Sequence, residues 1–384
     1  MISMLTANTS EIDDPELAVS EILEQLALPK NLWKNAVGIL TCYPECLDNG
    51  VVKAVCDSLP FNVVGCTTFA NGTKHDQGLT TLSISVLTSD SVHFSTACSD
   101  PLQDHDYLSP MDGAFKQAAA ALPEKPAMAI AFVPLMQFFS SDVLMGALNQ
   151  IAGNLPVFGT LPSDHTTDYN KSSVIYNGTP QPSSMAILLL SGPVSPRFFM
   201  ISIPEQNLQQ RALVTSSEGC VLQGVNNMPI IDYLETIGLC QGGDMEVIKI
   251  VPFVVDYNDG TPPIAYGIYR FLPDGSALFG GVTPHNSTIS VGAMESVDVL
   301  STTTQLISSI LGEPGVSGML IFSCICRGWA LGVEPLKEIQ LISEMAENVS
   351  YHMSYSGGEI CPVYNEHGQI FNRFHHYTCI VCAF

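Results

Sequence analysis

Positive charge is the first thing that this sequence has little of. Only 14 of its 384 residues are Lys or Arg, against 37 Asp or Glu, which gives a formal net charge of −23. A negative field of this size repels phosphate backbones and anionic lipid, so we expect no nucleic-acid binding and no binding to a membrane surface. Charged residues make up 13% of the chain and hydrophobic residues 46%, which is typical of a compact folded protein.

The sequence also lacks the common catalytic and targeting signals. It contains no G-x-x-x-x-G-K-[ST], G-x-G-x-x-G, H-E-x-x-H or G-x-S-x-G motif, so no particular reaction is indicated. No apolar run reaches the roughly 20 residues of a membrane-spanning helix. The first residues, MISMLTANTSEIDDPE, show no basic segment followed by an apolar one. We therefore expect a cytoplasmic protein without a membrane segment.

Twelve cysteines are present without the regular spacing of a disulfide framework. In a cytoplasmic protein we expect them to be reduced and mostly buried. Cys324-x-Cys326 and Cys379-x-x-Cys382 resemble zinc-ligand pairs, but both fall on predicted strands. Residues three apart on a strand point to opposite faces, and residues two apart lie about 6–7 Å apart, too far for two sulfurs on one zinc ion. Core packing is the favoured interpretation, with structural zinc as the alternative.

Hydrophobic periodicity predicts an α/β protein made of repeated strand–helix–strand–hairpin units that form mixed sheets. The last unit has a strand at 319–324, a helix at 334–346 and strands at 349–355 and 377–384. Similar units recur upstream, with predicted hairpins at 79–97 and 185–203, so we expect an internal duplication. The prediction is two closely packed halves, residues 14–205 and residues 206–384.

Polar side chains stand at the predicted strand ends, where ligands bind in open α/β sheets. Arg327 follows one strand, Glu359 follows the next, and His375 and His376 precede the last. In so acidic a chain, Arg327 either pairs with a buried partner such as Glu359 or binds an anionic ligand group. The two histidines are adjacent, so at most one faces a pocket. The alternative is a core histidine held by hydrogen bonds.

A second candidate turn follows a strand in the first half. Cys66, Thr67 and Thr68 offer a thiol, two hydroxyls and free backbone N–H groups. That set suits a small carboxylate or another polar ligand group. The alternative is an ordinary connection between a strand and a turn.

Five sequence blocks resemble, in order, the signature blocks of FIST domains: VVGCTTFANG (63–72), LPVFGTLPSD (155–164), SCICRG (323–328), GGEICPV (357–363) and FHHYT (374–378). The resemblance extends from about residue 14 to residue 384, with a FIST N-type part followed by a FIST C-type part. It implies a sensory protein that binds a small ligand. Since no output domain is recognised in the chain, it also implies signalling in trans to a histidine kinase, or to a diguanylate cyclase or phosphodiesterase.

Some free-standing members of this family with a similar layout are haem proteins that sense nitric oxide. The resemblance therefore implies haem b as a candidate cofactor, with His376 or His375 as the candidate iron ligand. Family members usually carry Asn where this chain has His376, and an imidazole can ligate iron. His352 and His285 are weaker candidates.

Two alternatives to a haem sensor remain open. One is a sensor for an amino-acid-like ligand, held by Arg327 and the turn Cys66–Thr68. The other is an enzyme that uses Cys66 or the pair of Arg327 and Glu359.

Overall fold

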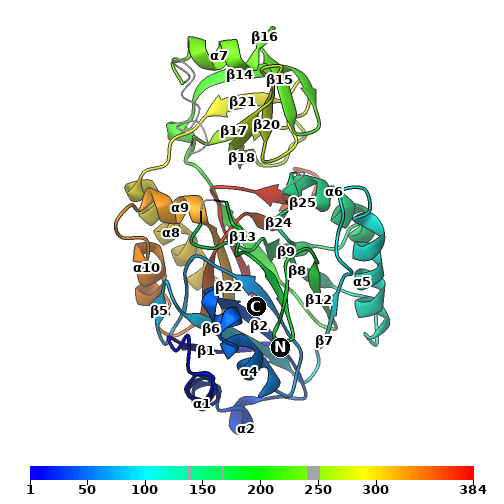
Figure 1. The fold of residues 1–384 in the computed structure, drawn as a ribbon, viewed down its shortest axis with the longest axis vertical. Helices are drawn as coiled ribbons and strands as arrows, with labels where there is room; N and C mark the ends of the chain where they lie inside the picture. The colour runs from blue at the N-terminus through cyan, green and yellow to red at the C-terminus, as the bar shows by residue number, and fades with distance from the viewer. Residues whose placement is uncertain (137–139, 167, 240–250) are drawn as a thin grey trace.

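The computed structural model describes residues 1–136, 140–166, 168–239 and 251–384. Figure 1 shows a large body, which carries both termini, and a smaller lobe above it. The predicted α/β class is confirmed, because helices cover several mixed sheets.

The body contains, within the described residues, three six-stranded sheets built on one plan. The first has the order β1 (Ser3–Thr9), β6 (Leu82–Ser89), β2 (Asn35–Cys42), β3 (Val63–Thr67), β10 (Val174–Tyr176), β11 (Thr179–Gln181). The second has the order β7 (His93–Cys98), β12 (Ala186–Ser191), β8 (Met128–Phe132), β9 (Val157–Thr160), β24 (Glu359–Tyr364), β25 (Ile370–His375). The third has the order β13 (Arg197–Ile201), β26 (Cys379–Ala383), β22 (Gly318–Cys324), β23 (Ser350–Ser356), β4 (Asn71–Thr73), β5 (Gln77–Gly78).

In each of these sheets the two middle strands are parallel and their neighbours are antiparallel. The last two strands of each sheet form a hairpin that belongs to another unit. β4 follows β3 in the chain but pairs with β23, β10 follows β9 but pairs with β3, and β24 follows β23 but pairs with β9. The three units therefore exchange hairpins in a closed ring. The predicted duplication corresponds to two of the three copies of this repeat.

The two predicted hairpins at 79–97 and 185–203 are wrong. β6 lies between β1 and β2, while β7 pairs with β12 in another sheet. β12 lies between β7 and β8, while β13 pairs with β26. β6 and β12 are buried along their whole length, so each requires a neighbour on both sides. The chain crosses from one sheet to the next where the sequence analysis expected a tight turn.

Helices cover the outer faces of the sheets (Figure 1). The short helices are α2 (Leu28–Asn31), α3 (Glu45–Asp48), α4 (Val51–Asp57) and α9 (Ile325–Ala330), and the longer ones are α1 (Pro15–Leu26), α5 (Leu108–Ala120), α6 (Ser141–Ala152), α8 (Ser296–Leu311) and α10 (Lys337–Met345). α1 begins where the sequence predicts, because the Asp14 carboxylate accepts from the Leu17 amide at 3.0 Å. Among the described residues, no helix is long and apolar enough to cross a membrane.

The inner faces of the three sheets meet in a central apolar core. Phe158 from the second sheet stacks on Phe322 from the third, with ring centroids 5.4 Å apart. Val64 and Cys66 of the first sheet belong to the same buried cluster. Apolar side chains thus pack the three pairs of parallel strands together at the middle of the body.

The upper lobe is a curled antiparallel sheet with one helix, α7 (Ile230–Thr236). Its strands are β14 (Gln209–Glu218), β15 (Val221–Val225), β16 (Met228–Pro229), β17 (Phe253–Asp256), β18 (Ile264–Tyr266), β19 (Ile268–Phe271), β20 (Ala277–Phe279) and β21 (Thr288–Val291). β18 and β19 stand at opposite ends of the sheet order, yet a single residue, Gly267, joins them. The sheet must therefore roll until its two ends lie close together.

The chain leaves the body after β13 and returns at α8, which places the upper lobe directly after the expected boundary at 205. The sheets of the body nevertheless combine strands from both sides of that boundary, since β13 pairs with β26 and β9 with β24. Residues 206–384 thus form the upper lobe and also contribute strands to the body. β1 precedes residue 14, the expected start of the first half, and was not predicted. As domain limits, 14–205 and 206–384 stay predictions.

Candidate functional site

The turns that follow the three parallel strand pairs are joined by hydrogen bonds at the centre of the body. The Thr68 hydroxyl donates to the Tyr355 carbonyl at 2.6 Å, and the Ser163 hydroxyl donates to the same carbonyl at 3.0 Å. The Gly357 amide donates to the Leu161 carbonyl at 3.1 Å. The predicted polar strand ends do converge, but their polar groups bind one another.

The polar groups of the turn Cys66–Thr68 are buried or bonded to other parts of the protein. Cys66 is 2% exposed, and burial raises the pKa of its thiol. The Thr67 hydroxyl accepts from the Ser173 amide at 2.9 Å, and the Thr67 amide donates to the Ser173 carbonyl at 2.9 Å. The Thr68 amide donates to the Cys42 carbonyl at 2.9 Å. The hydrogen-bonding groups that the sequence offered to a ligand are thus occupied here.

Arg327 has a buried partner, but it is not Glu359. Its guanidinium donates to the Glu338 carboxylate at 2.7 and 3.0 Å and to the Thr303 hydroxyl at 2.9 Å, and neither Arg327 nor Glu338 is exposed. The expected pairing with Glu359 is therefore wrong. Glu338 precedes Ile342 by four residues and so lies on the buried face of α10. That spacing could have identified it from the sequence.

Glu359 is enclosed close to the central junction. Its carboxyl accepts from the Thr378 hydroxyl at 2.7 Å and from the Ser356 hydroxyl. Burial raises the pKa of Glu359 well above its ordinary value, and the nearby Cys324 acts in the same direction. Glu359 and His375 are cross-strand neighbours on β24 and β25.

The two adjacent histidines have different surroundings. His375 is fully buried, and within the described residues neither of its ring nitrogens makes a hydrogen bond of good geometry. His376 is 6% exposed and faces the upper lobe, where its Nε2 lies 3.4 Å from the Tyr269 hydroxyl. The His376 ring also contacts Phe374, with centroids 4.8 Å apart. Burial lowers the pKa of His375 to about 3 and that of His376 to about 4.

The body and the upper lobe meet through specific polar contacts beside His376. The Ser140 hydroxyl donates to the Gly280 carbonyl at 2.6 Å, and the Val282 amide donates to the Asp142 carboxylate at 2.8 Å. Arg373 pairs with Asp259 at 2.5 Å, and its guanidinium lies 4.6 Å from the centroid of the Tyr257 ring. These contacts join the upper lobe to α6 and β25 of the body.

Five side chains that the sequence analysis did not bring together lie at this lobe junction. We call them the phenol–thiol cluster: Tyr169, Tyr269, Cys324, Cys326 and Tyr377. Burial raises the pKa of Tyr269 in the upper lobe, and the two thiols of the body act in the same direction. Burial and Cys326 likewise raise the pKa of Tyr169 and Tyr377, and both tyrosines adopt positive φ angles, 53° and 58°. Cys326 packs with Tyr377 in one apolar cluster.

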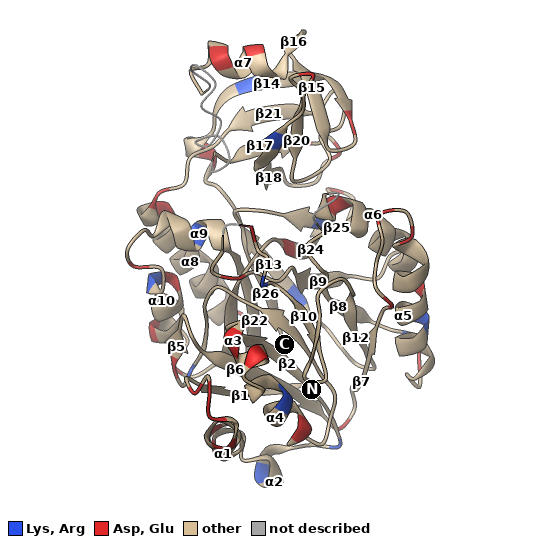
Figure 2. Ribbon diagram, in the orientation of Figure 1, with Lys and Arg blue, Asp and Glu red and all other residues tan. Residues whose placement is uncertain are grey.

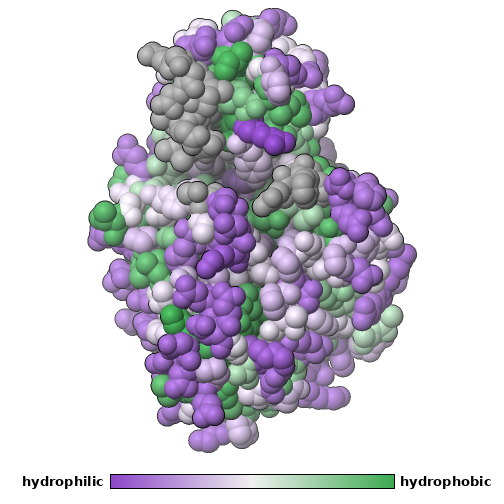
Figure 3. Space-filling view, in the orientation of Figure 1, coloured by the Kyte–Doolittle hydropathy of each residue, from purple (hydrophilic) through white to green (hydrophobic). Residues whose placement is uncertain are grey.

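The cluster borders a recess between the two parts of the molecule. Tyr269 of the upper lobe is 38% exposed, and its hydroxyl lies 3.4 Å from Nε2 of His376 in the body. Its side chain therefore lies at the boundary between the two parts and is open to water. Figure 3 shows the molecular surface hollowed at the waist between the upper lobe and the body. No sequence pattern predicts this group, because its members come from separate segments and tyrosine has no fixed spacing.

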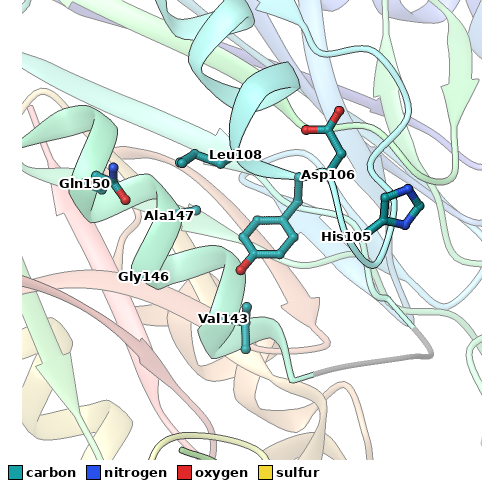
Figure 4. A pocket seen from close by; sticks show the side chains of 8 residues that line it. His105, Asp106, Leu108, Val143, Gly146, Ala147 and Gln150 are labelled. Carbon is teal, nitrogen blue, oxygen red and sulfur yellow. The ribbon is translucent and has the colours of Figure 1, made fainter.

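A different pocket lies on the outside of the body, between residues 105–108 and α6 (Figure 4). Its volume is about 400 Å³, and its walls include His105, Asp106, Val143 and Gln150. None of the residues that the sequence singled out lines it. We therefore place the candidate functional site at the lobe junction.

The surroundings of the two histidines at the lobe junction determine which of them could bind a haem iron. An axial ligand must present a free nitrogen, sulfur or oxygen at the wall of a cavity. His375 is enclosed and does not fit, whereas His376 is 6% exposed and has its Nε2 at the lobe junction, 3.4 Å from the Tyr269 hydroxyl. Among the described residues, no three His, Cys, Asp or Glu side chains are grouped as a protein-held metal ion would require.

Comparison with known proteins identifies the family. A FIST N domain model matches residues 36–228, and a FIST C domain model matches residues 241–362. No curated protein matches the sequence. The solved structures include cyanuric acid hydrolase from A. caulinodans, which aligns over 100% of this chain and 99% of its own at 9% identity, but its TM-score of 0.36 carries no argument. The two family matches cover most of the chain, which therefore belongs to the FIST family of sensory domains that bind small ligands in signalling proteins.

Proposed function

We propose that this chain is a non-catalytic cytoplasmic sensor that binds a small ligand in the recess between the upper lobe and the body. The observation that carries the proposal is the lobe junction, where Tyr269 of the upper lobe is 38% exposed and lies 3.4 Å from Nε2 of His376 in the body. The output is a partner in trans, either a histidine kinase or an enzyme that makes or degrades cyclic di-GMP. Membership of the FIST family supports the sensory part of this proposal.

The position of the recess offers a way to convert binding into a signal. Its walls come from both parts of the molecule, since Tyr269 belongs to the upper lobe while Cys326, His376 and Tyr377 belong to the body. A ligand that contacts both walls favours one position of the lobe over others. The partner would then detect the position of the lobe.

The charges at the recess narrow the class of ligand. Arg327 is enclosed with Glu338, and Arg373 is paired with Asp259. Figure 2 shows that acidic residues outnumber basic ones over both the lobe and the body. An amino-acid-like ligand would place its carboxylate among phenols and thiols, without either of these arginines available to it. We therefore favour an uncharged or metal-containing ligand over an amino acid.

Haem remains the specific candidate, with His376 as its iron ligand. Bound haem would supply an iron atom able to take up nitric oxide. The residues of the chain would hold that iron through the His376 imidazole and enclose the ring between the two parts of the molecule. Replacement of Tyr269 by Phe would remove the hydroxyl beside Nε2 and leave the imidazole in place.

The test is a titration of the purified full-length protein with hemin, followed by absorption spectroscopy. We expect a saturable Soret band that His376→Ala removes or shifts and that His375→Ala leaves in place. Tyr269→Phe serves as a control for the neighbouring hydroxyl and should retain the band. A protein that takes up no hemin, or a band unchanged in His376→Ala, would remove the haem proposal and leave the ligand site itself to be tested.

The enzyme alternative requires a reactive group that a substrate can reach. Cys66 is 2% exposed with a raised thiol pKa, and Arg327 does not pair with Glu359. Both features argue against a nucleophile or a catalytic pair. We expect Cys66 in the folded protein to resist alkylation by iodoacetamide. Rapid alkylation of Cys66 at neutral pH would instead favour the enzyme alternative.

A further inference from the structure

Two thiols of the phenol–thiol cluster come together because a strand ends between them. Cys324 is the last residue of β22, and α9 begins at Ile325. The sequence analysis placed Cys324 and Cys326 on one strand, about 6–7 Å apart, and that placement is wrong. In the structure Cys326 packs in one apolar cluster with Tyr377. Burial raises the pKa of Cys324, and the nearby Cys326 acts in the same direction.

The local backbone permits a covalent bond between these thiols. Cα atoms two residues apart are separated by about 5.4 Å in a helix and by at most about 7 Å in an extended chain. A disulfide joins Cα atoms about 4.4–6.8 Å apart. The change from strand to helix after Cys324 shortens the span toward the helical value.

The two thiols differ in access. Cys326 is partly exposed, whereas Cys324 is buried. Cys326 also lies at the lobe junction, where it packs against a cluster that contains Tyr377 of the body and Val254 and Ala265 of the upper lobe. An oxidant from solvent meets the partly exposed Cys326 first. Burial raises the thiol pKa of Cys324, but this thiol needs no access to solvent, because the oxidised sulfur that it would attack lies only two residues away.

We propose that Cys324 and Cys326 form a reversible disulfide when the protein meets hydrogen peroxide, which makes the recess a redox-responsive site. The Cys326 sulfur attacks one peroxide oxygen, the O–O bond breaks, one water leaves, and Cys326 carries a sulfenic acid. The Cys324 sulfur then attacks the Cys326 sulfur, the S–O bond breaks, and a second water leaves with the Cys324 proton. Two thiols are oxidised to one disulfide, and one peroxide is reduced to two waters. This step is independent of the ligand proposed above.

The protein contains its own optical reporter for this change. Arg327 follows Cys326 and anchors α9 to Glu338, while Trp329 on the same helix is 42% exposed. Closing a disulfide between the N-cap Cys324 and Cys326 in the first turn of α9 alters the entry of the chain into that helix. The sequence has two tryptophans, so Trp33→Phe leaves Trp329 as the single reporter.

The experiment uses the full-length Trp33→Phe protein, fully reduced and treated with up to one equivalent of hydrogen peroxide. Remaining thiols are alkylated with N-ethylmaleimide, and peptides are mapped by mass spectrometry. We expect the peptide with Cys324 and Cys326 to escape alkylation, to be lighter by two hydrogens and to return to the thiol form with dithiothreitol. Trp329 emission should shift over the same peroxide range and recover with the reductant.

Matched variants separate this pair from the other thiols. Cys326→Ser should abolish both the mass change and the emission shift. Cys98→Ser, which removes another partly exposed thiol of the described chain, should leave both unchanged. The proposal is overturned if both cysteines are still alkylated after one equivalent of peroxide, if Cys326 advances to a sulfinic acid beside an alkylated Cys324, or if Cys326 pairs with another cysteine. The peptide map of the parent protein decides the matter even if Cys326→Ser fails to fold.

Discussion

At the scale of single residues, the core of the body contains polar groups that are tightly matched to one another. His352 on β23 is fully buried, and its two ring nitrogens lie 2.7 Å from the Thr41 hydroxyl and 3.0 Å from the Ser85 hydroxyl. Burial lowers the pKa of His352 to about 3. This neutral imidazole links the first and third sheets and has no part in the recess.

The lowered pKa of His352 gives a prediction about pH. The unfolded chain takes up a proton at His352 near pH 6.5, while the folded protein does so only near pH 3, so this residue stabilises the fold less as pH falls below 6.5. Between pH 7.5 and pH 5 the loss is about 2 kcal/mol. His352→Gln should remove that part of the pH dependence in urea unfolding. Glu359, whose raised pKa acts in the opposite direction, is common to both proteins.

The matched control for His352 is His367, whose side chain is 80% exposed. His367→Gln should leave the change in unfolding free energy between pH 7.5 and pH 5 as it is in the parent protein. Equal pH dependence in the parent and in His352→Gln would contradict the buried neutral imidazole.

The buried pair of Arg327 and Glu338 gives a second prediction. Glu338→Gln leaves the Arg327 charge enclosed without an opposite charge, which costs about 3–5 kcal/mol of unfolding free energy. Glu334→Gln breaks an exposed pair with Lys337 and should leave chemical denaturation unchanged within error. An equal effect of the two substitutions would show that the Arg327 site tolerates an uncompensated charge.

At the scale of residues, the sequence was informative where the chemistry of one residue type limits its surroundings, as for a buried cation that requires an opposite charge. The scarce cation Arg327 was expected to pair with a buried carboxylate such as Glu359 or to bind an anionic ligand group, and its partner in the structure is Glu338 on the buried face of a helix. The phenol–thiol cluster could not be predicted, because tyrosines and cysteines are equally compatible with ordinary core packing.

At the scale of elements, strands and helices were predicted well and their pairing was not. The alternating pattern that identified β6 and β7 reports how each strand is buried, and it does not identify the neighbouring strand. β6 and β7 are consecutive in the chain and belong to different sheets. The turn after β22 was missed for a related reason, since the apolar residues at 324–326 continue the strand pattern while the backbone becomes helical.

Gly65 and Gly159 occupy matching positions in two of the repeated units, and they give a third prediction. A Cβ atom on Gly65 of β3 would lie 1.7 Å from the Leu40 carbonyl oxygen, and one on Gly159 of β9 would lie 2.1 Å from the Ala131 carbonyl oxygen. Each glycine therefore allows two parallel strands to pair. Gly65→Ala and Gly159→Ala should each cost at least about 1–3 kcal/mol in chemical denaturation.

The control for these glycines is Gly113 in α5, where an added Cβ meets nothing within 4 Å. Gly113→Ala should stabilise the protein by about 0.5–1 kcal/mol, because alanine is the better helix former. If Gly65→Ala or Gly159→Ala unfolds at the denaturant concentration of the parent protein, the close approach of the strands is wrong.

At the scale of the whole molecule, the α/β class and the family were accessible from the sequence, and the arrangement was not. Sequence blocks near β3, β9, β22 and β24 resemble those of FIST domains, and in the structure the turns after the parallel strand pairs meet at the central junction of the body. The exchange of hairpins around the ring depends on contacts between residues far apart in the chain, such as His352 with Thr73 on β4. Neither local propensity nor periodicity encodes such contacts.

The same scale contains the central claim, that the recess between the upper lobe and the body binds a small ligand. The most direct measurement is native mass spectrometry of the full-length protein purified from haem-replete cells, compared with its denatured mass. Tyr269→Trp enlarges a side chain in the recess, and Tyr364→Trp makes the same change at a residue that is 49% exposed on β24. We predict a bound non-protein mass in the parent and in Tyr364→Trp that Tyr269→Trp lacks. No bound mass in the parent, or the same bound mass in Tyr269→Trp, would contradict the account.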